Sequence, residues 1–100
     1  MARLIYTANA LADLERLTDF LLESDPTAAL HTIELIEEAV GILQRHPCVG
    51  RLVDQTLREL VISRGRSGYV ALYSYEELED CVLVLAVRHQ REAGYGSSDI

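Results

Sequence analysis

The sequence predicts a single α+β domain in which an N-terminal helical hairpin packs on an antiparallel sheet, with the order β-α-α-β-β-β. Apolar residues recur at helical spacing through the first half of the chain and with a period of two through the second half. Short breaks containing Pro, Gly, Asp and Ser separate these segments. Because 100 residues suit one domain, we expect a single domain over residues 1–93 and a flexible tail over 94–100.

The first elements expected are a short β-like run over residues 3–6 and a helix over residues 8–23. Thr7 can cap this helix, because its hydroxyl can accept one of the backbone N–H groups left free at a helix start. The apolar residues follow helical spacing, at Leu11, Leu14, Leu17 or Thr18, and Leu21. The acidic residues, Asp13 among them, fall largely off this stripe, so the helix is predicted to be amphipathic.

A second helix is expected from Pro26 to just before His46-Pro47. Asp25 is suited to the N-cap and Pro26 to the first helical position, where a missing N–H costs nothing. Since the break between the helices is so short, they should form an antiparallel hairpin. The apolar face of the second helix is wide, which indicates that it is covered on more than one side.

The remaining chain is predicted to form three strands joined by short links. Leu57–Ser63 and Tyr69–Tyr75 alternate with period two around turn residues 65–68, and residues 76–80 are an acidic connection. Cys81–Val87 is almost wholly apolar, which is typical of a central buried strand. Such short links require an antiparallel meander, which the helical hairpin can cover on one face.

The charge pattern argues against general affinity for nucleic acid. The net charge is −7 and every cation is an arginine. Residues 1–44 hold two arginines against eight acids, whereas residues 45–75 hold five arginines against two acids. Non-specific nucleic-acid binding depends on neutralising phosphates, so only a local arginine surface remains as a candidate contact for anions.

The order and spacing of several motifs resemble the RelE/ParE toxin superfamily from Leu4 to about Arg91. The resemblance is carried by Thr7 with Asp13-Leu14, Asp25-Pro26-Thr27-Ala28-Ala29, His46-Pro47 with Gly50-Arg51, Leu57-Arg58-Glu59-Leu60, Tyr69-Val70-Ala71-Leu72-Tyr73 and Val82-Leu83-Val84-Leu85-Ala86-Val87-Arg88-His89. Members of this superfamily are the toxins of type II toxin–antitoxin pairs. RelE-like members cleave mRNA in the ribosome, and ParE-like members poison DNA gyrase.

The resemblance implies a cognate antitoxin that wraps the toxin with an apolar helix and an extended segment. The wide face of the second helix and the sheet offer surface for it, and the candidate antitoxin contacts are Leu35, Ala39, Ile42, Tyr73 and Tyr75. A homodimer or a heterotetramer with the antitoxin is compatible with this role. We expect a cytoplasmic protein without a membrane segment, a metal site or a cofactor.

A nuclease of this superfamily would need basic groups gathered on one phosphate. Alignment on Ser67-Gly68-Tyr69 places Val61, Ser63 and Val70 where RelE-like toxins carry such groups, and none of the three can stabilise a phosphorane. If the chain does cut RNA without a metal, the candidate catalytic residues are His89, Arg91, Tyr95, Arg64 and Arg66.

The sequence therefore favours a ParE-like poison of DNA gyrase without a catalytic centre of its own. The candidate target contacts are Arg58, Arg64, Arg66, Arg88 and Arg91. Two alternatives stay open at this point. The chain could be a RelE-like ribosome-dependent mRNA endonuclease, or an inactive homologue that serves only as a binding module.

Overall fold

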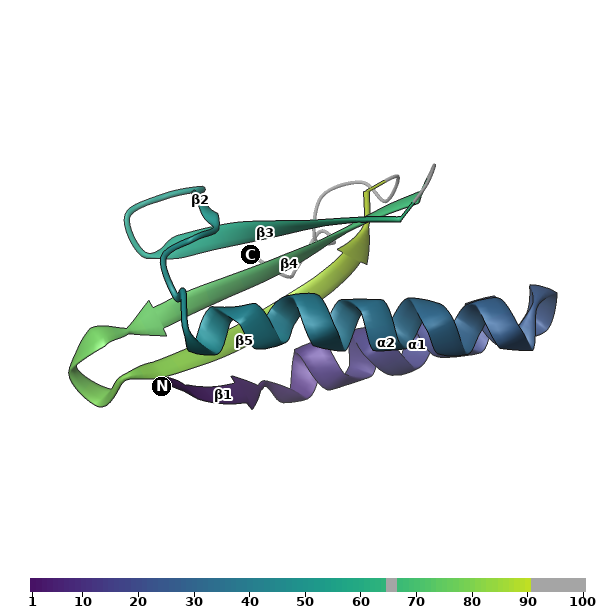
Figure 1. The fold of residues 1–100 in the computed structure, drawn as a ribbon, viewed down its shortest axis with the longest axis horizontal. Coiled ribbons are helices and arrows are strands. Elements are labelled where there is room, and N and C mark those ends of the chain that lie inside the picture. The colour runs from purple at the N-terminus through teal and green to yellow at the C-terminus, as the bar shows by residue number, and fades with distance from the viewer. Residues whose placement is uncertain (65–66, 91–100) are drawn as a thin grey trace.

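The computed structural model describes residues 1–64 and 67–90, and it has two layers. Helices α1 (Ala8–Ser24) and α2 (Pro26–Gly41) lie side by side over one face of a five-stranded sheet (Figure 1). The predicted order of elements is confirmed, with one addition, the two-residue strand β2 (Arg51–Leu52). The predicted tail 94–100 lies outside the described residues.

The sheet has the order β1-β5-β4-β3-β2. Strands β3 (Leu57–Arg64), β4 (Ser67–Glu76) and β5 (Cys81–His89) form the predicted antiparallel meander. Strand β1 (Arg3–Tyr6) runs parallel to β5, so the sheet is mixed and not wholly antiparallel as expected. Most of the chain separates β1 from β5, so no tight turn forces these two strands into opposite directions.

Side-chain caps fix the helix starts where the sequence places them. The Thr7 hydroxyl accepts the Ala10 N–H at 3.2 Å. Asp25 Oδ1 accepts the N–H groups of Thr27 and Ala28 at 3.1 and 3.2 Å, and Pro26 occupies the first turn. After Gly41 the chain tightens into a 3₁₀ turn, Ile42–Gln44, before it leaves the helical layer.

The core lies between the hairpin and the facing side of the sheet. Tyr69, Ala71 and Tyr73 alternate along β4 and are buried, so both of these tyrosines pack in the core. Helix α2 and the turn after it contribute Ile36, Val40 and Leu43, and β5 contributes Val82, Val84 and Val87. This packing fixes the register of the sheet, because a slip by one residue would turn these side chains to the opposite face.

Two residues of α1 depart from the predicted amphipathic pattern. Leu11 is exposed although it falls on the apolar stripe, and Asp13, predicted on the polar side, is only 5% exposed. Asp13 can be buried because its carboxylate accepts the Val87 N–H and pairs with Arg88. A buried carboxylate with such partners satisfies its hydrogen-bonding capacity, which apolar periodicity alone does not predict.

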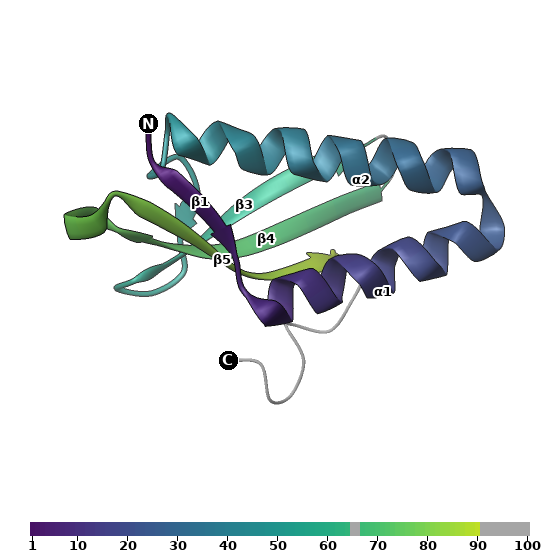
Figure 2. The ribbon, with the colours of Figure 1, turned by 90° about the horizontal axis from the view of Figure 1, so that it is seen from below.

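The far end of the hairpin projects beyond the strands (Figures 1 and 2). Large apolar side chains near this end are exposed, and Phe20, which lies beside the exposed Asp19 and Glu23 of α1, is 67% exposed. Leu22 and Leu30 are also exposed. None of the helices in the described part of the chain has the length and apolarity that a membrane span requires.

Candidate functional site

The arginine and histidine at the end of β5 are engaged by the protein's own groups. Arg88 Nη1 lies 3.4 Å from Asp13 Oδ1, and the Arg88 side chain is only 13% exposed. The His89 ring contacts the Tyr69 ring edge to face, with 5.2 Å between centroids. Arg88 is a candidate target contact and His89 a candidate catalyst, and in the structure each contacts a side chain of a neighbouring element, Asp13 of α1 or Tyr69 of β4.

An apolar pair lies at the positions where a RelE-like nuclease would carry basic groups. Val61 of β3 pairs with Val70 of β4, and Val70 pairs with Arg88 of β5. Val61 is 52% exposed, so a phosphate brought to this face would meet a hydrocarbon side chain. Among the nuclease candidates, the structure describes the side chain of His89 alone. Only the backbone of Arg64 is described, and Arg66, Arg91 and Tyr95 lie outside the described residues.

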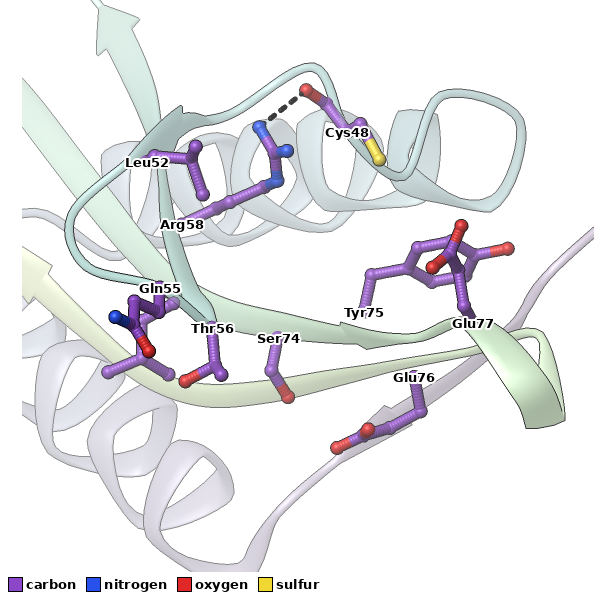
Figure 3. A pocket seen from close by; sticks show the side chains of 10 residues that line it. Cys48, Leu52, Gln55, Thr56, Arg58, Ser74, Tyr75, Glu76 and Glu77 are labelled. Carbon is purple, nitrogen blue, oxygen red and sulfur yellow. Dashed lines mark hydrogen bonds between the residues drawn. The ribbon is translucent and has the colours of Figure 1, made fainter.

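Arg58, another candidate target contact, is a clamp in the sense that its side chain holds the backbone before β2 by two hydrogen bonds. Its Nη1 donates to the carbonyl oxygen of Cys48 at 2.9 Å (Figure 3) and to that of Gly50 at 2.8 Å. The Gly50 N–H donates to the hydroxyl of buried Tyr73 at 2.9 Å. These bonds hold the segment before β2 against the sheet, since they tie its backbone to side chains of β3 and β4.

A groove of about 550 Å³ opens beside this clamp. It lies where the β3–β4 ladder begins, at the pair Leu57–Ser74. Strand β4 continues past this pair by Tyr75 and Glu76, which pair with β5 on their other side. The loop before β3, with Gln55 and Thr56, and the 3₁₀ turn Glu77–Glu79 bound the groove at either end.

The side chains of β4 divide this groove into two sides. Ser74, Glu76 and Thr56 point to one side of the strands, and Arg58 and Tyr75 point to the other (Figure 3). This division follows from the strand geometry, in which successive side chains point to opposite faces.

Ser74 and Glu76 on the first side make no side-chain contact with another polar group of the described residues, whereas the Thr56 hydroxyl donates to Asp54 Oδ1 at 3.4 Å. Ser74 is 9% exposed and Glu76 is exposed. Glu77 is also exposed and forms no ion pair with any described residue, and it lies on the side of Tyr75 (Figure 3). The groove therefore offers a free hydroxyl and a carboxylate on one side, and Arg58 and a second carboxylate on the other.

The acidic character of this end is also reflected in Tyr75. Its hydroxyl donates to Asp80 Oδ1 at 2.7 Å. This hydrogen bond, together with partial burial and the charges of Asp80, Glu77 and Cys48, raises the pKa of Tyr75 to about 12. The same bond secures the β4–β5 turn, where Asp80 adopts the left-handed conformation with φ of 49°.

The five residues predicted to contact an antitoxin differ in accessibility. Tyr73 is fully buried, so a partner cannot reach it in this conformation. Leu35, Ala39 and Tyr75 are half-buried and pack against the core. Ile42 is exposed. The wide apolar face of α2 is thus covered by the chain's own α1 and sheet, because α2 contacts both α1 and β3.

Sequence reasoning missed two surfaces. The exposed apolar residues Phe20, Leu22 and Leu30 lie near the end of the hairpin that extends past the sheet. The sequence signal for the first surface is that Phe20 falls outside the predicted apolar stripe of the first helix. The groove at Ser74 and Glu76 depends on where β3 begins relative to β4, for which the sequence contains no signal.

Comparisons with known proteins agree on one kind of protein. A protein-family model described as the ParE toxin of a type II toxin–antitoxin system, parDE, matches residues 4–94. Toxin RelE3 of Caulobacter vibrioides is 37% identical over 83 residues, which cover 83% of this chain and 88% of that toxin.

Solved structures of similar proteins share the fold. The chromosomal ParDE toxin–antitoxin system from P. aeruginosa contains a chain that is 25% identical with a TM-score of 0.75, covering 89% of this chain and 96% of that one. The toxin–antitoxin complex RelBE2 from Mycobacterium tuberculosis contains a chain that is 26% identical with a TM-score of 0.57, covering 89% and 98%.

Proposed function

The chain belongs to the ParE toxin family of type II toxin–antitoxin systems, and we propose that it arrests growth by binding DNA gyrase and not by cutting mRNA. The observation that carries this proposal is the apolar pair Val61–Val70, next to an Arg88 that is paired with buried Asp13. Among the residues whose side chains the structure describes, these positions near the end of β5 are thus hydrocarbon or paired within the fold.

The chemistry of metal-independent RNA cleavage supports this preference. One group must take the proton of the 2′-hydroxyl, another must stabilise the phosphorane, and a third must protonate the leaving oxygen. His89 is the only nuclease candidate with a described side chain, and it packs on Tyr69. With a net charge of −7, the chain would also be repelled by the phosphates that surround ribosomal mRNA.

A cognate antitoxin is the second partner that we propose, since two of the similar structures are toxin–antitoxin systems. Phe20, Leu22, Leu30 and Ile42 are exposed and suit the apolar side of a partner helix. We expect this encounter in the cytoplasm. A homodimer, or a heterotetramer with the antitoxin, stays a prediction.

The name of the relative Toxin RelE3 favours a second candidate function, a ribosome-dependent mRNA endonuclease. The test is to induce the chain in cells without its antitoxin and to record both DNA breaks and mRNA 5′ ends. The proposal expects filamentous cells with DNA breaks and unchanged mRNA ends, and the same result for His89→Ala. Cuts within translated codons that disappear in His89→Ala would contradict it and establish the nuclease. Unchanged growth would indicate an inactive binding module.

A further inference from the structure

We propose that the groove where the β3–β4 ladder begins binds a cationic side chain, arginine or lysine, carried by an extended segment of the antitoxin. This rests on the proposed function in one respect, namely that an antitoxin binds the chain. The site consists of the Ser74 hydroxyl and the Glu76 carboxylate on one side of β4, with Leu57 and Thr56 beside them.

Ser74 is the observation that distinguishes this groove from an ordinary acidic surface. The residue is 9% exposed and lines the groove, and its hydroxyl makes no hydrogen bond within the described residues. The hydroxyl oxygen is not among the fully buried atoms that lack a partner, so it is open to the groove. A donor carried by a ligand in the groove would supply the partner that the fold does not.

The carboxylates specify the charge of that ligand. The arginines nearest in the sheet do not neutralise Glu76. Arg58 lines the groove but points to the other side of β4 from Glu76 and donates to two backbone carbonyls (Figure 3). Arg51 pairs with Glu59, and Arg3 pairs with Glu79. Glu77 adds a further negative charge at the end of the groove, on the side of Arg58 and Tyr75. A guanidinium or ammonium group entering here would gain charge-assisted hydrogen bonds, and a phosphate would be repelled.

The shape of the groove favours a side chain from an extended segment. Tyr75 and Glu76 continue β4 past the start of β3, which leaves one edge of the strand open to a passing peptide. The aliphatic stem of an arginine or lysine would cover the half-buried Leu57, and its charged end would reach Ser74 and Glu76. Arginine suits the site better than lysine because its planar group can bind a carboxylate through two nitrogens.

The first experiment tests the chemistry of the groove without the antitoxin. The ¹⁵N-labelled chain is titrated with L-argininamide, and with N-acetyl-norleucine amide as a neutral control of similar length. The proposal expects saturable amide shifts confined to residues 55–57 and 74–77, only with argininamide, and their loss in Glu76→Gln. Shifts spread evenly over the acidic residues of the surface, or equal shifts in Glu76→Gln, would overturn the proposal.

The second experiment identifies the occupant by measuring the Kd of the full-length antitoxin for the chain at two salt concentrations. Glu76→Gln is expected to raise the Kd about tenfold and to weaken its salt dependence, and Ser74→Ala to raise it several-fold. The exposed helical acid Glu38 provides the matched control, and Glu38→Gln should stay within twofold. Thermal unfolding of each variant separates lost contacts from lost folding.

The outcomes of the two experiments separate this inference from the proposed function. An antitoxin that binds all three variants equally would overturn the assignment of the occupant, although the toxin–antitoxin pair itself would stand. Variants that keep antitoxin binding but lose growth arrest would also overturn it, because they would assign the groove to the cellular target. If the unaltered chain bound no antitoxin, the proposed partner would be wrong, and so would the antitoxin as occupant.

Discussion

Replacing Asp13 by alanine should destabilise the chain severely, because this carboxylate joins α1 to the end of β5. Asp13 Oδ2 accepts the Val87 N–H at 2.9 Å, and Oδ1 lies 3.4 Å from Arg88 Nη1. The two side chains are only 7% and 13% exposed, so solvent cannot replace the lost partner freely. Arg16, at 3.9 Å and half-exposed, adds little.

The expected loss in unfolding free energy is roughly 3–5 kcal/mol, the usual cost of removing one partner of a buried ion pair. About 1–3 kcal/mol of this arises from the buried Val87 N–H left without an acceptor. For a domain of 100 residues, 1 kcal/mol corresponds to roughly 4–8 °C in Tm, so Tm should fall by at least about 12 °C. Asp13→Asn keeps an oxygen for Val87 and should lose about half as much.

Urea unfolding followed by circular dichroism measures these losses, provided that the slope m is unchanged. Asp19, an exposed acid on the same helix, gives the control, and Asp19→Ala should change stability by less than about 0.5 kcal/mol. If Asp13→Ala cost less than about 1 kcal/mol, the carboxylate would not hold the end of β5, and the assignment of Arg88 to the fold would be wrong.

Four further predictions follow from local geometry. Gly50→Ala would place a methyl carbon 2.6 Å from a tyrosine hydroxyl and 2.7 Å from a backbone oxygen, so it should cost about 2–4 kcal/mol in urea unfolding. Gly41→Ala meets nothing within 4 Å and should stabilise α2 by about 0.5–1 kcal/mol in the same assay; equal effects of the two changes would contradict this. The folded state raises the pKa of Tyr75 from 10.0 to about 12. The neutral Tyr75 hydroxyl therefore contributes fully to folding stability below pH 10, and this contribution is lost as pH rises towards 12. Tyr75→Phe should make Tm fall less steeply between pH 10 and 12. Hydrogen bonds from the backbone N–H groups of Thr56 and Leu57 lower the pKa of Asp54 below 3.8. The Asp54 carboxylate therefore contributes to folding stability above pH 3.8, and this contribution is lost on further acidification. Asp54→Ala should make Tm fall less as pH drops below 3.8.

Local chemistry made the order of elements predictable. Thr7 and Asp25 mark helix starts by side-chain bonds within three residues, and the change of period from 3.6 to two marks where the strands begin. The parallel pairing of β1 with β5 could not be predicted in this way. It joins residues about 78 positions apart, such as Arg3 and Cys81, and depends on how the whole hairpin packs.

The site was less predictable than the fold, because a residue type does not reveal its partners. Arg58 and Arg88 are the kind of side chain that binds targets, yet one clamps backbone carbonyls and the other pairs with Asp13. Ser74 carries no signal in the sequence, since its importance comes from its burial beside the end of the β3–β4 ladder. The pairing of Val61 with Val70 could not be inferred from a turn at residues 65–68, because the β3–β4 ladder extends to the pair Arg64–Ser67, inside the predicted turn.

The claim that this toxin acts through a protein target is tested most directly with purified gyrase. The chain is incubated with gyrase, ATP and supercoiled plasmid, and the DNA is analysed after denaturation and protein digestion. Our account predicts linear plasmid that accumulates with toxin dose, that vanishes when antitoxin is added, and that persists in His89→Ala. Plasmid that stays intact at every dose, while translating ribosomes yield cut mRNA with the same preparation, would contradict it.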